Sequence, residues 1–284
     1  PDHFDVAVTE GCAAGTFTYS GQPFGATVTA RNAAGGATAN YQGASYARAT
    51  TLTARNAGDT AANPGAGALA GEAIGAAAFT GGVATITAAT VPALTYTVPT
   101  ATTPTVVRLR ATENAPGGDG VTSLRAPPAA TVEGTTTVRS GRLAIGNAYG
   151  SEFIALPVRS ETQFWTATGW QRNVNDSCTA LTVPTSANAG LTFATQTPSN
   201  QLAAGETAAA FGVVADAFGR APVVAGNAGL RFSAPGAGNF GYVDVVGNTV
   251  RGANTWLLLA TPTSRVCFGS CGPRNSIIYS QERF

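Results

Sequence analysis

The sequence contains no lysine, no methionine and a single histidine, and each absence excludes a kind of chemistry. Without lysine there is no P-loop lysine, no Schiff-base nucleophile and no lysine–asparagine isopeptide bond of the kind found in some surface adhesins. With His3 as the sole histidine, a metal centre built from several imidazoles is impossible. Most familiar catalytic arrangements are therefore excluded, and we predict that the protein is not an enzyme.

Charged side chains are also scarce. They make up 11% of the 284 residues, compared with about a quarter in typical soluble domains. Because lysine is absent, all 16 basic residues are arginine, and the net charge at pH 7 is only +1. Such a small charge creates no long-range field that would attract nucleic acid or an anionic membrane surface. No nucleic-acid partner is predicted.

No targeting or membrane-spanning segment is recognisable in the sequence. Pro1–Phe4 lacks the basic start and apolar run of a signal peptide. The most apolar long stretch, Gly65 to Leu94, contains Glu72 and never reaches the roughly 18 consecutive apolar residues that a spanning helix needs. We expect a processed, trimmed or partial chain whose export signal lies upstream, with no membrane span.

The residues that are abundant favour β-structure. The 35 glycines and 16 prolines oppose long helices, and short apolar segments alternate with Gly, Pro and Asn turn signals. We predict an all-β fold with two immunoglobulin-like β-sandwich domains, residues 1–112 and 140–284, joined by a Pro/Gly-rich connection over residues 113–139. Ile154 to Thr166 is expected to form one long strand of the second domain.

Two similar strings mark the ends of strands in the first domain. Residues 29–35 read TARNAAG and residues 53–58 read TARNAG. The sequences around them diverge, which argues against a tandem repeat. We predict that each string is a junction where a strand passes into a turn.

The four cysteines indicate an oxidising compartment. Cys267 and Cys271 are close in sequence, Cys12 and Cys178 are far apart, and four cysteines allow three pairings. The simplest pairing joins Cys267 to Cys271 and leaves Cys12 to join Cys178. Four free thiols in a reduced protein are the alternative, which the low charge and high Thr and Gly content oppose. A zinc site at Cys267 and Cys271 would lack further nearby ligands.

A series of strings along the chain resembles one known family. In order, they are PDHFDVAV, FTYSGQPFGATVTARNAAGGATANYQG, GDGVTS, SGRLAIGNAYGSE, ALPVRSETQFW, NDSCTAL, LRFSAPGAGNFGYVDV and RNSIIYSQERF. Together they resemble the C-terminal domain of the MSHA biogenesis protein MshQ family over essentially the whole chain. The most specific parts are Gly141 to Glu152, Asn175 to Thr179 and Arg274 to Phe284.

The resemblance implies an exported protein of a type IV pilus system with an adhesive role, and it implies no catalytic residues. In this family a lectin-like sandwich often lies upstream of the region seen here. One departure is that family members usually have FG-x-Y near the end, where this chain has Cys267-Phe-Gly-Ser-Cys271. Two extra cysteines that arrive together support a local bridge. Cys12 and Cys178, at the family's cysteine positions, are then left to pair with each other.

Three motifs that could carry chemistry have plainer interpretations. His3 with Asp2 or Asp5 could be drawn into a triad, but the chain has no G-x-S-x-G elbow, and we interpret His3 as an exposed terminal histidine. The G-x-G-x-x-G string at residues 236–241 precedes strand-like sequence instead of a helix, so we predict a hairpin turn. The acidic residues form no EF-hand loop, although a calcium ion held by loop carbonyls stays open. We predict no cofactor, no metal and no catalytic residue.

The aromatic residues offer a candidate glycan-stacking surface. Tyr41, Tyr46 and Tyr149 lie in or near glycine-rich loops, and Trp170 flanks a turn. Exposed aromatic rings stack on sugar rings, so these four residues are the candidates. Packing in the hydrophobic core is the competing interpretation, and we favour it.

The end of the chain offers a candidate assembly segment. Ile277, Ile278 and Tyr279 form a short apolar run close to the terminal Phe284. In a β-protein with few charges on its edges, such a segment can complete a sheet of a neighbouring molecule. Pairing within its own domain is the alternative, which we favour.

These inferences together predict an extracellular, non-enzymatic module of a bacterial surface appendage. In one hypothesis the chain is the stalk of a pilus-associated adhesin, and a missing upstream domain contacts host or surface glycans. In the alternative, the chain polymerises into a filament through strand edges or strand exchange. The expected partners are other copies of the chain or pilus subunits.

Overall fold

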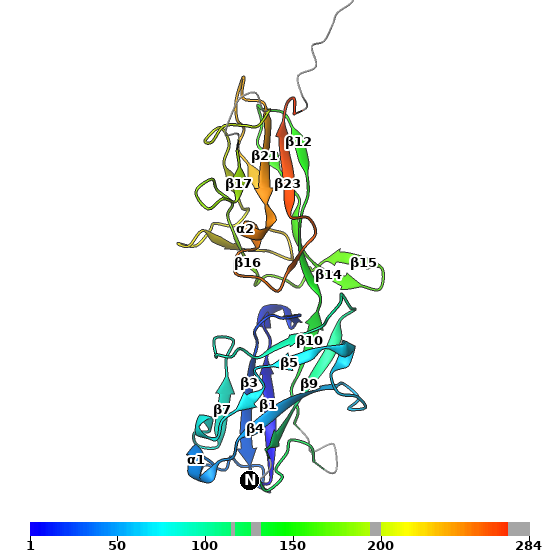
Figure 1. The fold of residues 1–284 in the computed structure, drawn as a ribbon, viewed down its shortest axis with the longest axis vertical. Coiled ribbons are helices and arrows are strands. Elements are labelled where there is room, and N and C mark those ends of the chain that lie inside the picture. Colours follow the sequence, from blue (N-terminus) through cyan, green and yellow to red (C-terminus); the bar gives the residue numbers. More distant parts are fainter. Residues whose placement is uncertain (115–116, 126–131, 194–199, 272–284) are drawn as a thin grey trace, which may run out of the picture. The chain divides into compact units, whose positions relative to one another are not determined.

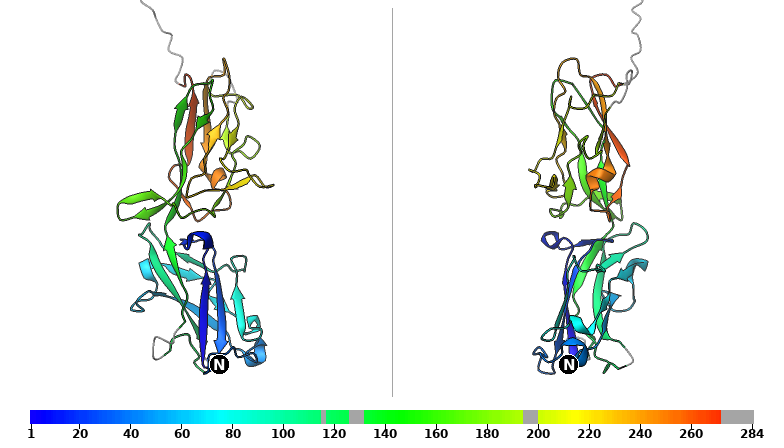
Figure 2. Two further views of the ribbon diagram at one scale, coloured as in Figure 1. Left: turned by 180° about the vertical axis from the view of Figure 1, so that it is seen from behind. Right: turned by 60° about the vertical axis from the view of Figure 1, so that its left-hand side comes forward.

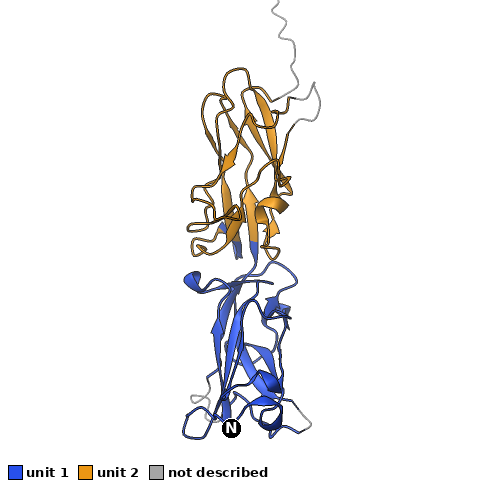
Figure 3. Cartoon of the chain, turned by 90° about the vertical axis from the view of Figure 1, so that its left-hand side faces the viewer, with its two compact units in different colours: residues 1–141, 164–171 blue, residues 142–163, 172–284 orange. Residues whose placement is uncertain are grey.

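The computed structural model describes residues 1–114, 117–125, 132–193 and 200–271. The chain divides into two compact units, as Figure 3 shows. Unit 1 comprises Pro1–Gly141 with Phe164–Gln171, and unit 2 comprises Arg142–Gln163 with Arg172–Phe284. Both are built mainly from short β-strands arranged in facing sheets. The predicted fold class, all-β with two immunoglobulin-like sandwiches, is confirmed.

Unit 1 begins with ten strands. They are β1 (His3–Thr9), β2 (Thr18–Tyr19), β3 (Gly25–Arg31), β4 (Thr50–Asn56), β5 (Ala68–Ala70), β6 (Ala73–Ile74), β7 (Val83–Ile86), β8 (Thr95–Thr97), β9 (Thr105–Glu113) and β10 (Thr135–Arg139). The helical elements are single turns: η1 (Ala13–Gly15), α1 (Gly43–Tyr46), η2 (Pro64–Ala66) and η3 (Ala76–Ala78).

The strands of unit 1 form two main sheets and one small one. The order of the first sheet is β1-β3-β7, and the order of the second is β2-β10-β9-β4-β6. The long antiparallel pair β1–β3 is visible in Figure 1 and from two further sides in Figure 2. Antiparallel pairs build both sheets, except that β10 pairs with β2 in parallel. Strands β5 and β8 form a separate antiparallel pair.

Period-two alternation places the core of unit 1 between the sheets. Along β9, Val107, Leu109 and Ala111 are buried, whereas Arg108 and Arg110 point to the other face. An aromatic cluster of Phe4, Tyr41 and Phe79 fills one region of this core, with ring centroids 5.0 to 6.1 Å apart. All three rings of this cluster are therefore almost fully buried.

Part of the expected connection, residues 113–139, is a strand of unit 1. Residues 135–139 read TTTVR and form β10, which pairs with β9. Thr136 and Val138 are each only 2% exposed because they face the core. Sequence analysis assigned this strand to the connection because proline and glycine residues precede it. Its own β-branched residues are nevertheless typical of a β-strand.

The two TARN strings are strand-to-turn junctions, as predicted. Strand β3 ends at Arg31, and the side-chain oxygen of Asn32 accepts hydrogen bonds from the backbone N–H groups of Ala34 and Gly36. Strand β4 ends at Asn56, whose side-chain oxygen accepts hydrogen bonds from the next turn in the same way. Asparagine suits this position because its short amide mimics a backbone turn.

Unit 2 contains the remaining strands. They are β11 (Gly141–Ile145), β12 (Ala148–Gly150), β13 (Leu156–Pro157), β14 (Ser160–Thr166), β15 (Gly169–Arg172), β16 (Ala180–Thr182), β17 (Leu191–Thr192), β18 (Ala209–Ala210), β19 (Arg220–Pro222), β20 (Arg231–Phe232), β21 (Gly241–Val246), β22 (Leu258–Leu259) and β23 (Thr263–Phe268). One short helix, α2 (Gly247–Arg251), follows β21. Strands β14 and β15 belong partly to unit 1, because Phe164–Gln171 is assigned there.

Several short sheets enclose the core of unit 2. Their strand orders are β15-β14-β11-β22, β12-β23-β21-β17, β13-β20-β18 and β16-β19. The core contains Val243 and Val245 from β21, Val266 and Phe268 from β23, and Phe232 from β20, all fully buried.

The predicted long strand from Ile154 to Thr166 is interrupted. Ile154 is exposed and lies in a turn, where its backbone N–H donates to the carbonyl of Ser151. Strand β13 ends at Pro157, and β14 begins at Ser160. The two strands belong to different sheets, because β13 pairs with β20 whereas β14 lies between β15 and β11.

Candidate functional site

No cysteine in the described part of the chain is free. Cys267 and Cys271 are bonded to each other across the end of β23, so the predicted local bridge is present. Cys12 and Cys178 are each disulfide-bonded as well. Their pairing with each other stays a prediction.

His3 is buried, contrary to the prediction of an exposed terminal residue. It is 4% exposed because β1 pairs with β3 from its first residue, where His3 lies opposite Arg31. The ring nitrogen Nδ1 lies 2.9 Å from Asp2 Oδ2, and Nε2 lies 3.5 Å from Asp5 Oδ1. Arg31 Nε donates to the other oxygen of Asp5 at 2.6 Å. The histidine is thus held between two carboxylates inside a network of charged side chains.

The glycine string at residues 236–241 forms a turn that leads into a strand, but the predicted hairpin is wrong, because β20 before the turn and β21 after it belong to different sheets. Gly236 and Gly238 have positive φ angles of 92° and 85°, and the backbone N–H of Asn239 donates to the carbonyl of Gly236. Strand β21 starts directly at Gly241. No helix N-terminus follows the turn, so it lacks the element that would bind a dinucleotide pyrophosphate.

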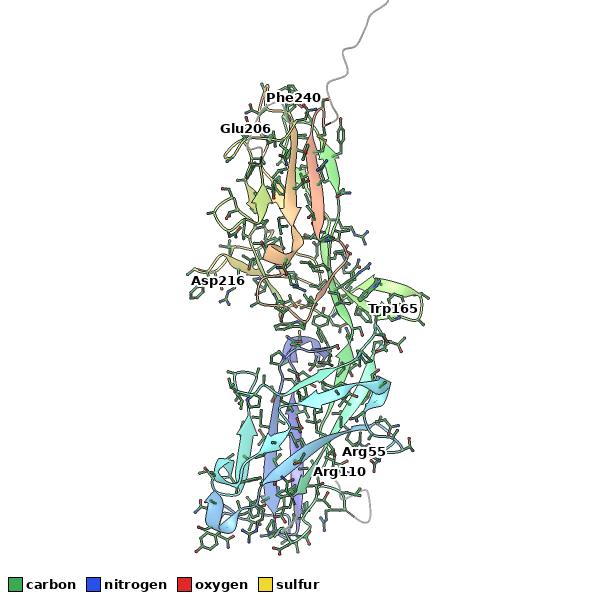
Figure 4. All side chains as sticks on the ribbon, viewed as in Figure 1. Arg55, Arg110, Trp165, Glu206, Asp216 and Phe240 are labelled. Carbon is green, nitrogen blue, oxygen red and sulfur yellow. A yellow bond between two sulfur atoms is a disulfide. The ribbon has the colours of Figure 1, made fainter. Side chains whose placement is uncertain are left out.

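The four candidate aromatic residues differ in their surroundings. Tyr41 is wrong as a surface candidate, because it is 3% exposed and packs against Phe4 and Phe79 in the core. Tyr46 in α1 and Tyr149 in β12 are 72% and 73% exposed. Trp170 is half-buried and meets Trp165 edge to face, with ring centroids 5.4 Å apart; Trp165 is labelled in Figure 4. Stacking on sugars by the exposed residues stays a prediction.

The candidate assembly residues Ile277, Ile278, Tyr279 and Phe284 lie outside the described residues. Their part in strand exchange stays a prediction.

A network of ion pairs covers the outer face of unit 1. Arg110 on β9 donates to both oxygens of Glu133, at 2.7 and 3.2 Å, and to Asp59 at 2.8 Å. Arg55 on β4 donates to the other oxygen of Asp59 at 2.8 Å. Figure 4 labels Arg55 and Arg110, whose strands are neighbours in the sheet. The two arginine contacts lower the pKa of Asp59 to about 2.

A buried carboxylate fixes a loop at one end of unit 1. Glu113 is 6% exposed, and it accepts hydrogen bonds from the Tyr41 hydroxyl at 2.7 Å and from the backbone N–H of Asp119 at 2.8 Å. Burial, followed by the hydrogen bond to Glu113, raises the pKa of Tyr41 to about 12. Both groups therefore have structural partners, and neither is open to a substrate.

Unit 2 carries an open groove lined by charged side chains, which we call the arginine groove. Its volume is roughly 540 Å³, and its lining includes Arg159, Glu161, Asn227, Gly229 and Arg231. Its floor is a pair of antiparallel segments that contain β13 and β20. Pro157 pairs with Arg231 in this register, and Glu161 bridges to Asn227.

Alternation along the two segments explains how the groove forms. Leu156, Val158 and Ser160 are buried on one side, so Pro157, Arg159 and Glu161 face outward. The same alternation on the opposite segment turns Asn227, Gly229 and Arg231 outward. The register places Gly229 opposite Arg159. Because glycine has no side chain, the space above this position stays open and forms part of the groove.

Hydrogen bonds orient the charges beside this floor. Arg159 donates to Glu161 Oε2 at 3.0 Å, and the Gln163 amide donates to the same oxygen at 3.2 Å. Arg142 Nε donates in turn to the Gln163 carbonyl oxygen at 2.8 Å. The hydrogen bond from Arg159 is the main reason that the pKa of Glu161 is lowered, and the charge of Arg172 adds to the effect.

Sequence reasoning missed the arginine groove. The only signal was the alternation of polar and apolar residues over 157–161 and again over 227–231. Nothing in the sequence shows that these two segments pair, or in which register. No helix in the described ranges is long and apolar enough to cross a membrane.

Family comparisons divide the chain close to the boundary of the two units. Residues 1–138 match the third domain of DUF6701, and residues 139–283 match its fourth domain. The chain belongs to the DUF6701 family. Two consecutive domains of DUF6701 are thus present in the order in which the family numbers them. No curated protein matches the chain.

Solved structures similar to this DUF6701 chain include two bacterial surface proteins. FdeC, described as a broadly conserved Escherichia coli adhesin, is 14% identical with a TM-score of 0.39, over 95% of this chain and 65% of the other. Invasin, described as a bacterial integrin-binding protein, is also 14% identical with a TM-score of 0.26, over 93% of this chain and 39% of the other. The chain therefore spans less than two thirds of either structure, and likeness this weak says nothing about what it binds.

Proposed function

We propose that this chain is a non-enzymatic, exported module of a bacterial surface protein, and that it forms part of the stalk of a pilus-associated adhesin. The observation that carries the proposal is the match to two consecutively numbered domains of one family, each of them a β-sandwich. Domains of this kind in series act as spacers that hold a binding domain away from the cell. The disulfide-bonded cysteines suit an oxidising, extracellular location.

The association with a pilus is supported by the sequence resemblance to the MshQ family. That resemblance includes NDSCTAL around Cys178 and SGRLAIGNAYGSE at β11 and β12. It points to a surface appendage as the location and to pilus subunits as partners. In this proposal, host or surface glycans are contacted mainly by a domain upstream of this chain.

The contacts of the potentially reactive side chains support the proposal that the chain is not an enzyme. His3 lies between two carboxylates in the first strand, and Glu113 and Glu133 are buried in ion pairs or hydrogen bonds of unit 1. These groups stabilise the fold. Each already has protein partners at hydrogen-bonding distance.

The proposal is tested by locating the protein on cells. An antibody raised against the purified chain is used for immunogold labelling of intact bacteria that produce the full-length protein. We expect gold particles outside the cell and in the sheared pilus fraction, and we expect adhesion to fall when the gene is deleted. Labelling confined to the cytoplasm of permeabilised cells would contradict the proposal.

A second candidate function, assembly into a filament, is favoured by one edge of unit 2. Strand β12 is the outer strand of its sheet, and its Tyr149 is exposed, as are Phe153 and Ile154 directly after it. An edge strand with apolar side chains is a template for pairing with another chain. The predicted assembly segment around Ile277 is a natural candidate for that pairing.

A further inference from the structure

We infer that the arginine groove of unit 2 binds an acidic polysaccharide through the carboxylate or sulfate groups of its sugars. The inference rests on the proposed adhesive function, which it deepens by naming a ligand class and a site within this chain.

The first observation is that the charge of the groove is not neutralised. Arg159 and Arg231 line the groove, and Glu161 is the one acidic residue among its described lining residues. Two guanidinium groups and one carboxylate therefore lie among the described lining residues, which leaves the groove with one positive charge in excess. The net charge of the whole chain is only +1.

The second observation is the exposure of the two lining arginines. The Arg159 side chain is 70% exposed although it contacts Glu161. Arg231 is exposed, and it forms no ion pair with any residue that the structure describes. Elsewhere the chain pairs its arginines more fully, as with Arg110 and its two carboxylates in unit 1. Arg159 and Arg231 therefore have donors available for an anion from solution.

The third observation is the spacing of these donors. Arg231 lies opposite Pro157, so Arg159 is its diagonal neighbour across the strand pair. Diagonal neighbours on one face of a sheet lie about 7 to 8 Å apart, and their Cβ atoms are somewhat closer. A ligand with an acidic group on successive sugars meets both arginines at once, with Gly229 leaving room for the sugar rings between them.

The chemistry of guanidinium groups favours this class of ligand. Arginine presents a planar fork of donors that matches a carboxylate or sulfate group with two parallel hydrogen bonds. Asn227 adds an amide that can bond to sugar hydroxyls, and the exposed Pro157 adds apolar surface for the C–H face of a ring. Among the described residues, none that lines the groove is aromatic. Grooves that bind single-stranded nucleic acid combine basic side chains with aromatic rings on which bases stack, so the groove fits a polysaccharide better.

The test measures binding of the purified, disulfide-intact chain to immobilised polysaccharides by surface plasmon resonance. Heparin supplies sulfate groups, alginate supplies carboxylate groups, and dextran is the neutral control. The groove variant is the double substitution Arg159→Gln with Arg231→Gln. The matched control is Arg220→Gln with Arg265→Gln, because both of these arginines are also in unit 2 and their removal changes the net charge equally.

We expect heparin, alginate or both to bind, dextran not to bind, and binding to weaken as salt is added. The groove variant should bind at least about tenfold more weakly, because two charge-assisted contacts are lost. The control variant should stay within about twofold of the unchanged protein, since its arginines are already paired with Asp216 and Asp244. Circular dichroism of both variants checks that they are folded.

Three results would overturn the inference. They are no binding of either acidic polysaccharide, equal weakening by the groove and control variants, or equally tight binding of a single-stranded DNA oligonucleotide. Because binding is measured on the purified chain, a negative binding result would not contradict the proposed location at the cell surface. Localisation can likewise fail while the groove still binds, so the two proposals are tested separately.

Discussion

Arg110 and Glu133 form a two-pronged ion pair, with Arg110 Nε 2.7 Å from Glu133 Oε1 and Arg110 Nη2 3.2 Å from Oε2. Arg110 lies on β9, whereas Glu133 lies just before β10, beside β1. The Glu133 side chain is 1% exposed, and it also accepts a hydrogen bond from Ser123. This pair therefore joins segments that are distant in sequence along one side of unit 1.

Glu133→Gln is predicted to destabilise unit 1. The substitution removes a buried negative charge and leaves Arg110, which is 13% exposed, with Asp59 as its one remaining acidic partner in the described part of the chain. Breaking a buried ion pair by removing one partner costs about 3 kcal/mol, and we expect a loss of that size in urea unfolding. Arg265→Gln is the control, because its partner pair with Asp244 is half exposed and is worth no more than about 1 kcal/mol. Equal effects of the two substitutions would contradict the structural role assigned to Glu133.

Asp59 is predicted to make the stability of unit 1 depend on acid pH. Hydrogen bonds from Arg110 and Arg55 lower its pKa from 3.8 to about 2 in the folded state. Because the folded pKa is the lower one, this stabilisation is present above pH 4 and is lost as the pH falls toward 2. Urea unfolding of the unchanged protein and of Asp59→Asn between pH 2 and pH 6 measures the difference. The gap in stability should close at the acidic end, and a gap independent of pH would refute the assignment.

Tyr41 is predicted to ionise late in an alkaline titration. Burial and the hydrogen bond to Glu113 raise its pKa to about 12, and burial raises the pKa of Tyr96 to about 12. Two of the seven tyrosines should therefore contribute ultraviolet absorbance changes near pH 12. In Tyr41→Phe, one of these two late steps should disappear.

The same shift predicts the effect of alkali on folding. The neutral hydroxyl is favoured in the folded state, so its stabilisation is present below pH 10 and is lost as the pH rises toward 12. Tyr46→Phe is the matched control, because that side chain is 72% exposed. If Tyr46→Phe removed a late step and Tyr41→Phe did not, the burial of Tyr41 would be refuted.

The cysteines are predicted to form two disulfides without any free thiol. Intact-mass analysis after alkylation should show no modified cysteine before reduction and four after it. Peptide mapping should recover the Cys267–Cys271 bridge within one peptide, and a second linkage between the peptides that contain Cys12 and Cys178. Recovery of mixed linkages, or of alkylated thiols in the unreduced protein, would contradict the prediction.

Local sequence patterns were enough to predict the fold class and several turns. The turns at Asn32 and Asn56 could be predicted from the TARN strings, because each asparagine side chain accepts hydrogen bonds from backbone N–H groups only a few residues later. The glycine string at residues 236–241 is also recognisable as a turn from local sequence, because strand-like sequence follows its glycines directly. Such features depend on short-range interactions only.

Features that depend on contacts between distant segments could not be predicted. His3 is buried because β1 pairs with β3, which brings Arg31 and Asp5 around it. Tyr41 lies in a glycine-rich stretch that looks exposed in the sequence, yet its ring packs against Phe4 and Phe79. The arginine groove likewise requires that residues 157–161 pair with residues 227–231 in one register. A shift of one residue would turn Arg159 into the core.

The most direct test of the central claim, that the chain is a stalk module and does not polymerise, is electron microscopy of the purified chain under non-reducing conditions. The account predicts dispersed single particles over the whole range of protein concentration. Regular filaments with a subunit repeat would contradict it, and would establish the alternative of assembly through exposed strand edges such as β12.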